Sequence, residues 1–184
     1  RLDVGFGRGS GSGYEYHGYN IDPGESQERF QESIRIIQGL WTTPDFTFEG
    51  KHFQASHANL VPTPVQQPHP PVYLAATRTP ATLDFAVSTG HTLCIAVVQD
   101  TADALDLCQR FVDKSAEAGF NVPKSQIPFF RYFYVAETEE QAVQDTRDKL
   151  DWVIDIMQWR NNINEGSEVY QHMADGGARA SSFR

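Results

Sequence analysis

The sequence has little of what marks disulfide-stabilised, metal-binding or membrane-spanning proteins. Only two of its 184 residues are cysteine, Cys94 and Cys108, which is too few for a disulfide framework, and no Cys/His spacing is typical of a zinc site. The longest apolar run, 93–98, is far too short to cross a bilayer. We therefore expect no metal, no membrane segment, and reduced thiols in the core of a cytoplasmic protein.

Positive charge is also scarce. The chain has 15 Lys and Arg against 24 Asp and Glu, a formal net charge of −9, which argues against nucleic acid or an anionic membrane as a partner. Hydrophobic residues make up 40% and aromatic residues 12%, a globular composition with enough apolar surface for one sizeable core. The chain starts at Arg1 without an initiator Met and ends on the polar stretch 176–184, so we expect a piece of a longer chain.

Strands alternate with helices along the sequence. The apolar and aromatic runs predict strands over 1–7, 72–76, 92–98 and 127–136, and the periodic segments predict helices over 22–43, 79–90, 101–119 and from 138 onward. A small hairpin over 46–55 and a proline-rich connection together occupy 44–71. This order, βα(β-hairpin)βαβαβα, predicts an α/β fold with a parallel sheet.

Local signals set the ends and faces of these elements. Asp22 and Thr79 are predicted helix N-caps, each followed by a proline, and Gly90 closes the second helix. Thr138 begins a capping box. In the helix over 101–119 the predicted inward residues are Leu105, Cys108, Phe111 and Val112. In the strand over 127–136, Phe129, Arg131, Phe133 and Val135 are predicted on one face and Phe130, Tyr132 and Tyr134 on the other.

Two architectures fit this order, a doubly wound sheet and a (β/α)₈ barrel. A whole barrel needs eight units and about 250 residues. Four units in 184 residues fit a fragment of such a barrel. In either architecture ligands bind where the carboxyl ends of the strands meet the following loops, here 7–13, 76–80 and 136–138.

The first of these loops is rich in glycine and carries Arg8. It lacks the dinucleotide fingerprint G-x-G-x-x-G, because Ser10 follows Gly5 and Gly7 where a glycine is needed, and it lacks the lysine of a P-loop. Free backbone N–H groups and a guanidinium nevertheless suit a phosphate. The alternative is a tight connection that binds nothing.

The second loop places Thr77, Arg78 and Thr79 just before a helix N-terminus, where N–H groups attract an anion. Two hydroxyls and a guanidinium there would suit a phosphate. The alternatives are that Thr79 serves only as the N-cap and that Arg78 is a surface charge. The six histidines form no H-x-x-x-H pair, and His17 is the one near a predicted ligand loop.

Several segments together carry a resemblance to a known family. They are the stretch 1–9, Glu15-Tyr16 with Gly18-Tyr19, the stretches 28–32, 40–42 and 48–51, the proline-rich stretch 61–71, and 135–138 with Ala142. In this order they resemble the luciferase-like flavin monooxygenases, a family of (β/α)₈ proteins that includes bacterial luciferase. The match runs over about residues 1–145.

The resemblance implies that the chain covers barrel strands four to seven. It implies reduced FMN at the carboxyl ends of the strands, with the phosphate held by Arg8 and by Thr77. The remaining residues implied to line the cofactor are Gly7, Gly9, Tyr16, Ala76, Arg78 and Thr79, with Tyr14 as the alternative to Tyr16. Gly7 stands where bacterial luciferase has a cysteine, so luciferase activity itself is not implied. Residues 159–184 resemble the start of a mobile active-site lid.

The implied activity is oxygenation of a small organic substrate by reduced FMN and O₂, with the flavin supplied by a flavin reductase and the full-length protein a homodimer. The family's catalytic histidine lies on an early strand outside this chain, so the catalytic residue here is unknown. Three alternatives stay open: an F420-dependent oxidoreductase of the same superfamily, a flavin-binding relative without catalysis, and a phosphosugar enzyme. The Arg8 turn favours FMN over F420, because the F420 members tend to have an acidic turn.

Overall fold

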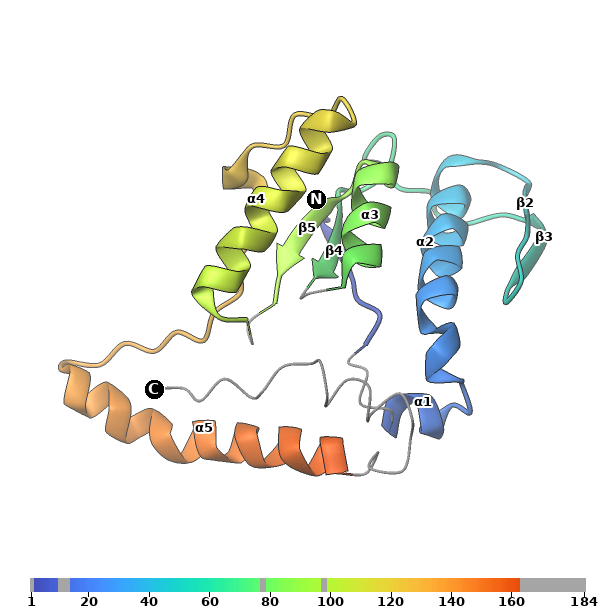
Figure 1. Ribbon diagram of the computed structural model, residues 1–184. Helices are drawn as coiled ribbons and strands as arrows, with labels where there is room; N and C mark the ends of the chain where they lie inside the picture. The colour runs from blue at the N-terminus through green and yellow to red at the C-terminus, as the bar shows by residue number, and fades with distance from the viewer. Residues whose placement is uncertain (1, 10–13, 77–78, 97–98, 163–184) are drawn as a thin grey trace. The chain divides into compact units, whose positions relative to one another are not determined.

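The computed structural model describes residues 2–9, 14–76, 79–96 and 99–162, and of Tyr14, His17 and 157–162 only the backbone (Figure 1). The chain divides into two compact units. The first comprises Arg1–Arg8 and Glu25–Phe130, and the second comprises Gly9–Gly24 and Arg131–Arg184.

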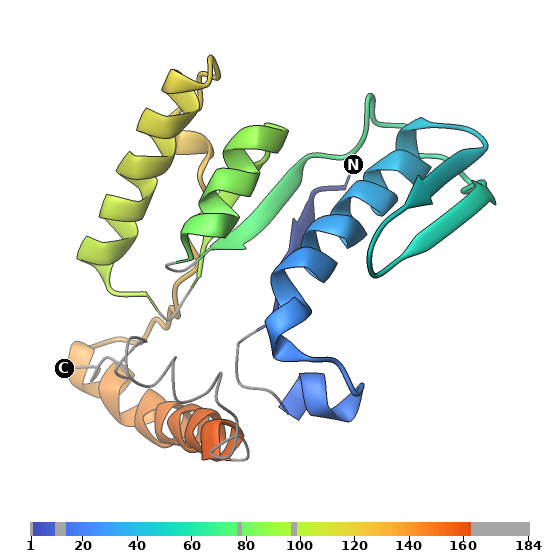
Figure 2. The ribbon, with the colours of Figure 1, turned by 45° about the vertical axis from the view of Figure 1, so that its right-hand side comes forward.

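The first unit is built on a three-stranded parallel sheet. Its strands are β1 (Val4–Phe6), β4 (Val72–Ala76) and β5 (Thr92–Ile95), in the order β1-β4-β5 (Figure 2). The register pairs Phe6 with Leu74 and Ala76 with Ile95. Each parallel crossover contains a helix, as a parallel sheet requires. The predicted α/β fold with parallel strands is therefore confirmed within this unit.

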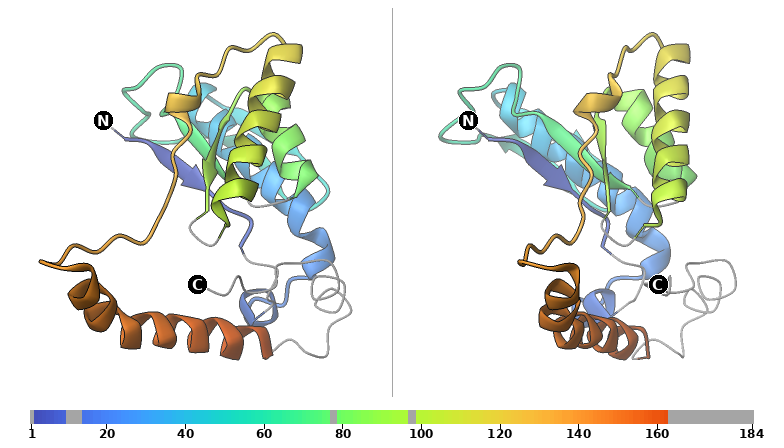
Figure 3. Two further views of the ribbon diagram at one scale, coloured as in Figure 1. Left: turned by 60° about the vertical axis from the view of Figure 1, so that its left-hand side comes forward. Right: turned by 90° about the vertical axis from the view of Figure 1, so that its left-hand side faces the viewer.

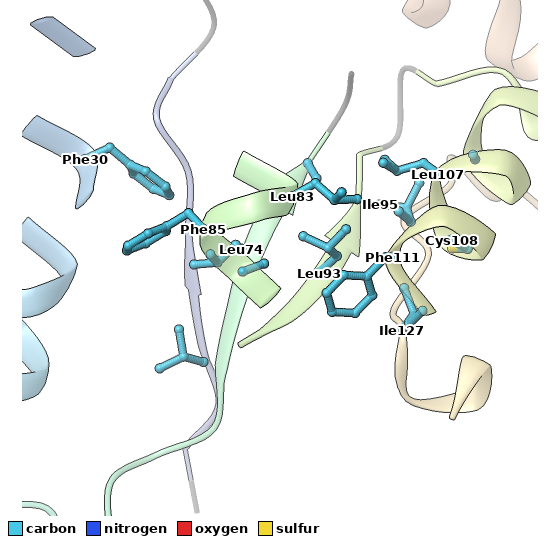
Figure 4. Packing of buried hydrophobic residues seen from close by; sticks show 14 of the residues in the cluster. Phe30, Leu74, Leu83, Phe85, Leu93, Ile95, Leu107, Cys108, Phe111 and Ile127 are labelled. Atoms are coloured by element: carbon cyan, nitrogen blue, oxygen red, sulfur yellow. The ribbon is translucent and has the colours of Figure 1, made fainter. Parts of the chain in front are cut away.

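Three helices pack with this sheet around one hydrophobic core. They are α2 (Ser26–Thr42), α3 (Pro80–Thr89) and α4 (Thr101–Glu117), and α3 contacts both of the others. Leu74, Leu93 and Ile95 are fully buried beneath them, and the rings of Phe30 and Phe85 meet edge to face at 6.2 Å (Figure 4). On β4, Val72, Leu74 and Ala76 are buried and Ala75 is exposed, so the helices cover one face of the sheet.

The inward face of α4 confirms the predicted Cys108, Phe111 and partly buried Val112 and differs from the prediction at Leu105. Ala104, Leu107, Cys108, Phe111 and Ser115 are buried, whereas Leu105 is 59% exposed. The prediction placed the apolar stripe too far round the helix because it passed over the small residues Ala104 and Ser115, which let α4 approach its neighbours closely. Cys94 and Cys108 are buried and unpaired, and burial raises the pKa of both thiols.

The ends of α3 follow their sequence signals, whereas the start of α2 does not: the predicted N-cap Asp22 precedes a 3₁₀ turn, and the N-cap residue of α2 is Glu25. The Gly24 N–H donates to Asp22 Oδ1 at 2.8 Å, which opens a 3₁₀ turn, η1 (Pro23–Glu25), ahead of α2. Gly90 ends α3 in the left-handed region at φ 69°, where a glycine is favoured. Thr79 is the N-cap residue of α3, as predicted, and its side chain makes no capping hydrogen bond.

The predicted hairpin is present as β2 (Phe46–Glu49) and β3 (Gln54–Ala58), with the second strand later than expected. Glu32 of α2 holds its turn: Oε1 accepts from Lys51 N at 2.8 Å, and Oε2 accepts from His52 N at 2.9 Å and Phe53 N at 3.0 Å. Burial alone would raise the pKa of Glu32, but these three N–H groups outweigh it and hold the pKa below its usual value.

The predicted strand over 127–136 does not form. After a 3₁₀ turn, η2 (Lys124–Gln126), Phe129 makes one isolated parallel bridge to Ile95, and no described residue from 130 to 136 pairs in a sheet. Phe133 and Val135 are 88% and 71% exposed, so the predicted division of this segment into two faces has no sheet to support it. Aromatic alternation favours a strand only where a neighbouring strand supplies the ladder.

The second unit contains two helices. The short helix α1 (Tyr14–Gly18) was not predicted, whereas α5 (Glu139–Asn162) was, and Figure 3 shows α5 as one long continuous helix. Gln141 N donates to Thr138 Oγ1 at 3.1 Å, which confirms the predicted cap. Of the predicted lid segment, residues 163–184 lie outside the described residues. Among the helices described, none combines the length and apolar character that crossing a membrane requires.

Candidate cofactor-binding site

The carboxyl ends of β1 and β4 bring three of the predicted residues to one edge of the sheet. Gly7 and Arg8 follow β1 directly, and a Cβ placed on Gly7 would lie 3.6 Å from the Cβ of Ala75 on β4. Ala76 ends β4, and its carbonyl accepts from the Ala96 N–H beyond β5 at 3.4 Å. Gly7, Arg8 and Ala76 therefore lie at the edge where ligands bind in parallel α/β folds.

Arg8 is held at this edge by a residue that the sequence prediction missed. Its Nη1 donates to Ser26 Oγ at 3.3 Å, across 18 positions of the chain. Ser26 is 8% exposed and is the first residue of α2. Because a helix that follows a parallel strand runs back antiparallel to it, the helix start lies at the strand's carboxyl end, and this topological rule was the signal available in the sequence.

Gly9 and Tyr16 lie together in the second unit. Gly9 adopts φ 84°, a left-handed conformation that favours glycine. A Cβ placed there would lie 3.1 Å from Glu15 Oε2 and 3.5 Å from the Tyr16 hydroxyl oxygen. The conformation and the crowding both account for a glycine at this position.

The second predicted loop is described only at its ends. Thr77 and Arg78 lie outside the described residues. Thr79 has an extended backbone, and its carbonyl accepts from Thr82 N at 3.1 Å at the start of α3. The Thr79 hydroxyl makes no capping hydrogen bond there. Helix capping therefore does not occupy this hydroxyl, which keeps it as a candidate for the cofactor phosphate.

The first turn of α2 carries a further polar group. The Oε1 and Nε2 atoms of Gln27 are both buried, and neither has a hydrogen-bond partner among the described residues. The helical spacing places Gln27 on the same face as Phe30 and Ile34, which enter the core. A buried amide without partners costs about 1–3 kcal/mol, so this position suits contact with a polar group.

The described residues hold no cluster typical of a metal centre. No three or more His, Cys, Asp or Glu side chains among them are grouped closely enough to bind an ion. The groups assembled at the carboxyl edge are a guanidinium, a hydroxyl, a buried carboxamide and the start of a helix. This set suits an anionic, hydrogen-bonding ligand.

Two curated proteins that resemble the chain over part of their length are named as flavin-dependent or FMNH₂-dependent monooxygenases. The chain is 30% identical over 144 residues to the oxygenase component of a flavin-dependent trigonelline monooxygenase from Acinetobacter baylyi, covering 77% of this chain and 39% of the relative. It is 34% identical over 53 residues to an FMNH₂-dependent dimethylsulfone monooxygenase from Pseudomonas putida, covering 29% of this chain and 15% of that protein. The chain thus spans about two fifths of the first relative.

Solved structures agree on the fold. The monooxygenase RslO1 from Streptomyces bottropensis matches 80% of this chain and 45% of its own, with a TM-score of 0.72 and 28% identity. An F420-dependent secondary alcohol dehydrogenase matches the same share of this chain with a TM-score of 0.60 and 22% identity, a likeness of fold alone. The sequence pattern of the luciferase-like monooxygenases matches residues 1–182. The chain therefore belongs to the luciferase-like monooxygenase family, whose members are (β/α)₈ barrels.

Proposed function

We propose that the protein binds reduced FMN at the carboxyl edge of the β1-β4-β5 sheet and, with O₂, oxygenates a small organic substrate. The observation that carries this proposal is Arg8, directly after β1 and bonded to Ser26 at the start of α2. The relatives named as flavin-dependent and FMNH₂-dependent monooxygenases support it. The share of those relatives that the chain spans supports a fragment of a barrel, and we propose that the fragment covers strands four to seven.

The residues at this edge fit a flavin mononucleotide. A phosphate is recognised by a guanidinium and by the positive end of a helix dipole, and Arg8 and the start of α3 supply these two features. The buried carboxamide of Gln27 fits the hydrogen-bonding character of the cofactor. We extend the proposal to Thr77 and Arg78, which lie between β4 and α3 in the chain, and the family resemblance also implies cofactor-lining roles for Gly9 and Tyr16.

The flavin, when bound in its reduced form, supplies the two electrons for oxygen chemistry. The part proposed for this chain's own residues is to hold and orient. Arg8 neutralises the phosphate, and the apolar core beneath the helices keeps the edge rigid. We propose that the reduced flavin comes from a separate flavin reductase and that the full-length protein is a cytoplasmic homodimer.

Binding by the natural full-length protein tests the cofactor. Anaerobic titration with reduced FMN and, separately, with reduced F420 should give saturable binding of FMN and none of F420. Binding of F420 alone would overturn the proposal in favour of the oxidoreductase alternative.

Turnover tests the reaction. With a flavin reductase, NADH and ¹⁸O₂, we expect one labelled oxygen atom in the product from a panel that includes heteroaromatic betaines and sulfones, the classes named for the two relatives. Tight FMN binding without label in any product over a broad panel would support a flavin-binding relative without catalysis. A reductase-free reaction mixture is the control for uncoupled oxidation.

A further inference from the structure

We propose that Ser26 is a positioning residue that orients the Arg8 guanidinium for the cofactor phosphate; this rests on the function proposed above. The Ser26 hydroxyl accepts from Arg8 Nη1 at 3.3 Å and is 8% exposed. The proposal therefore assigns to the start of α2 a part in cofactor recognition through Arg8, without direct contact between Ser26 and the cofactor.

A positioning residue must itself be fixed, and the first two turns of α2 are held from several sides. Arg29 Nε donates to Glu25 Oε2 at 2.8 Å, one turn apart on the helix. The His52 side chain is 4% exposed and lies between two carboxylates, with Nδ1 3.5 Å from Glu25 Oε2 and Nε2 2.9 Å from Glu28 Oε2. These contacts tie the hairpin to the same end of the helix that carries Ser26.

The turn of the hairpin adds a second attachment further along α2. Glu32 accepts the backbone N–H groups of Lys51, His52 and Phe53, and Lys51 Nζ lies 2.7 Å from Glu28 Oε2. A Cβ placed on Gly50 would lie 2.5 Å from Glu32 Oε2, so the turn and the helix are in close contact. The hairpin therefore holds in place the first turns of α2, which include Ser26.

The hydrogen bond between Arg8 and Ser26 matters because of the geometry of the arginine side chain. The guanidinium is planar, with five N–H donors in a fixed fork, so its affinity for phosphate depends on the direction in which the plane faces. A long side chain that must be ordered on binding loses rotamer freedom. A hydrogen bond from one N–H to a fixed hydroxyl holds the plane before the ligand arrives.

The test compares two ligands that differ only in the phosphate. In the natural full-length protein, Ser26→Ala should weaken binding of reduced FMN by about 3- to 10-fold, the range that one hydrogen bond is worth, and leave binding of reduced riboflavin unchanged. Ser26→Thr, which keeps the hydroxyl, should restore FMN affinity. In an Arg8→Ala background, Ser26→Ala should have no further effect on FMN.

Several outcomes would overturn the assignment. Equal weakening for FMN and riboflavin would show a general structural role, and an unchanged FMN affinity would remove Ser26 from the site. An equal effect of Ser26→Ala with and without Arg8 would exclude action through Arg8. Should Ser26→Ala fail to fold, Ser26→Cys, whose thiol is a weak acceptor, replaces it in the same comparison. Failure of the wild type to bind FMN would overturn the proposed function itself, a result distinct from all of these.

Discussion

Two glutamines on one helix show how the two ends of the first unit differ. Gln38, in the second half of α2, has both amide atoms paired: Nε2 contacts His69 Nε2 at 3.2 Å, and Oε1 contacts His91 Nε2 at 3.2 Å. Gln27, in the first turn, has both amide atoms buried and unpaired among the described residues. The buried amide near the amino end of the sheet is paired within the protein, and the buried amide near the carboxyl end is not paired among the described residues.

The hydrogen bonds at the amino end also determine which ring nitrogens of His69 and His91 carry a proton. His69 Nδ1 donates to the Pro70 carbonyl at 2.7 Å, so in a neutral ring its Nε2 accepts from the Gln38 amide. His91 Nε2 then donates to Gln38 Oε1. The His69 ring also packs on Trp41 at 5.9 Å. A hydrogen-bond network of this kind contributes to stability, whereas the buried Gln27 amide gains no such contribution from the described residues.

The largest expected effect is a loss of folding stability at low pH, caused by His91 at the amino end of the sheet. Burial, together with the facing His69, lowers the pKa of His91 from 6.5 to about 4. Between these two values the unfolded chain binds the proton and the folded chain does not, so stability falls as the pH drops from 7 to 4, by up to about 3 kcal/mol. Urea unfolding of the natural full-length protein at several pH values measures this loss.

The matched control for this loss is His91→Gln, which cannot take up the proton. Carboxylates such as Glu32 titrate in both proteins, so the difference between the two stability profiles isolates the histidine. Parallel profiles for wild type and variant would show that His91 does not contribute to the acid sensitivity.

The next largest effect concerns the carboxyl end. Arg8→Ala should weaken binding of reduced FMN by roughly 1.5–3 kcal/mol, the range for a hydrogen bond to a charged group, with little change in melting temperature. Arg110→Ala is the matched control, because Arg110 pairs with Asp106 on the same helix at 2.8 Å and is not among the residues proposed for the cofactor site. Isothermal titration of both variants gives the comparison, and an affinity unchanged by Arg8→Ala would remove Arg8 from the cofactor site.

The smallest effect tests the two glutamines directly. Gln38→Leu leaves the buried His91 without its acceptor and should lower the free energy of unfolding by roughly 1–3 kcal/mol. Gln27→Leu replaces an unpaired buried amide with an apolar group of similar shape and should not lower it. Urea unfolding of both variants measures the two free energies. A larger loss of unfolding free energy for Gln27→Leu than for Gln38→Leu would show that Gln27, and not Gln38, is the stabilising glutamine.

The strands and helices with strong local signals are the ones that sequence predicted well. The run 72–76 is β4 with the predicted bounds, and Pro80 and Gly90 bracket α3. The strand predicted over 127–136 was wrong. The alternation of its side chains is a local signal, whereas strand pairing depends on a neighbouring strand that continues beyond Ile95. The helix α1 was missed because five residues beside a glycine-rich turn show no periodicity.

The candidate site divides in the same way. Arg8 and its loop were found from the sequence, since a guanidinium on a glycine-rich turn after a strand is a local pattern. Ser26 and Gln27 were not, because nothing in the residues near them indicates a ligand; only the return of α2 to the carboxyl edge brings Ser26 to Arg8. The two-residue stretch 77–78 stays a prediction.

The sequence by itself determined most of the alternation of strands and helices, the ends of α3, the cap of α5 and the family, because each depends on residues close together in the chain. The tertiary structure decided which face of α4 is buried, which predicted strand pairs, and which side chain holds Arg8. These depend on contacts between residues far apart in the chain, and their energies come from packing and pairing rather than from local preference.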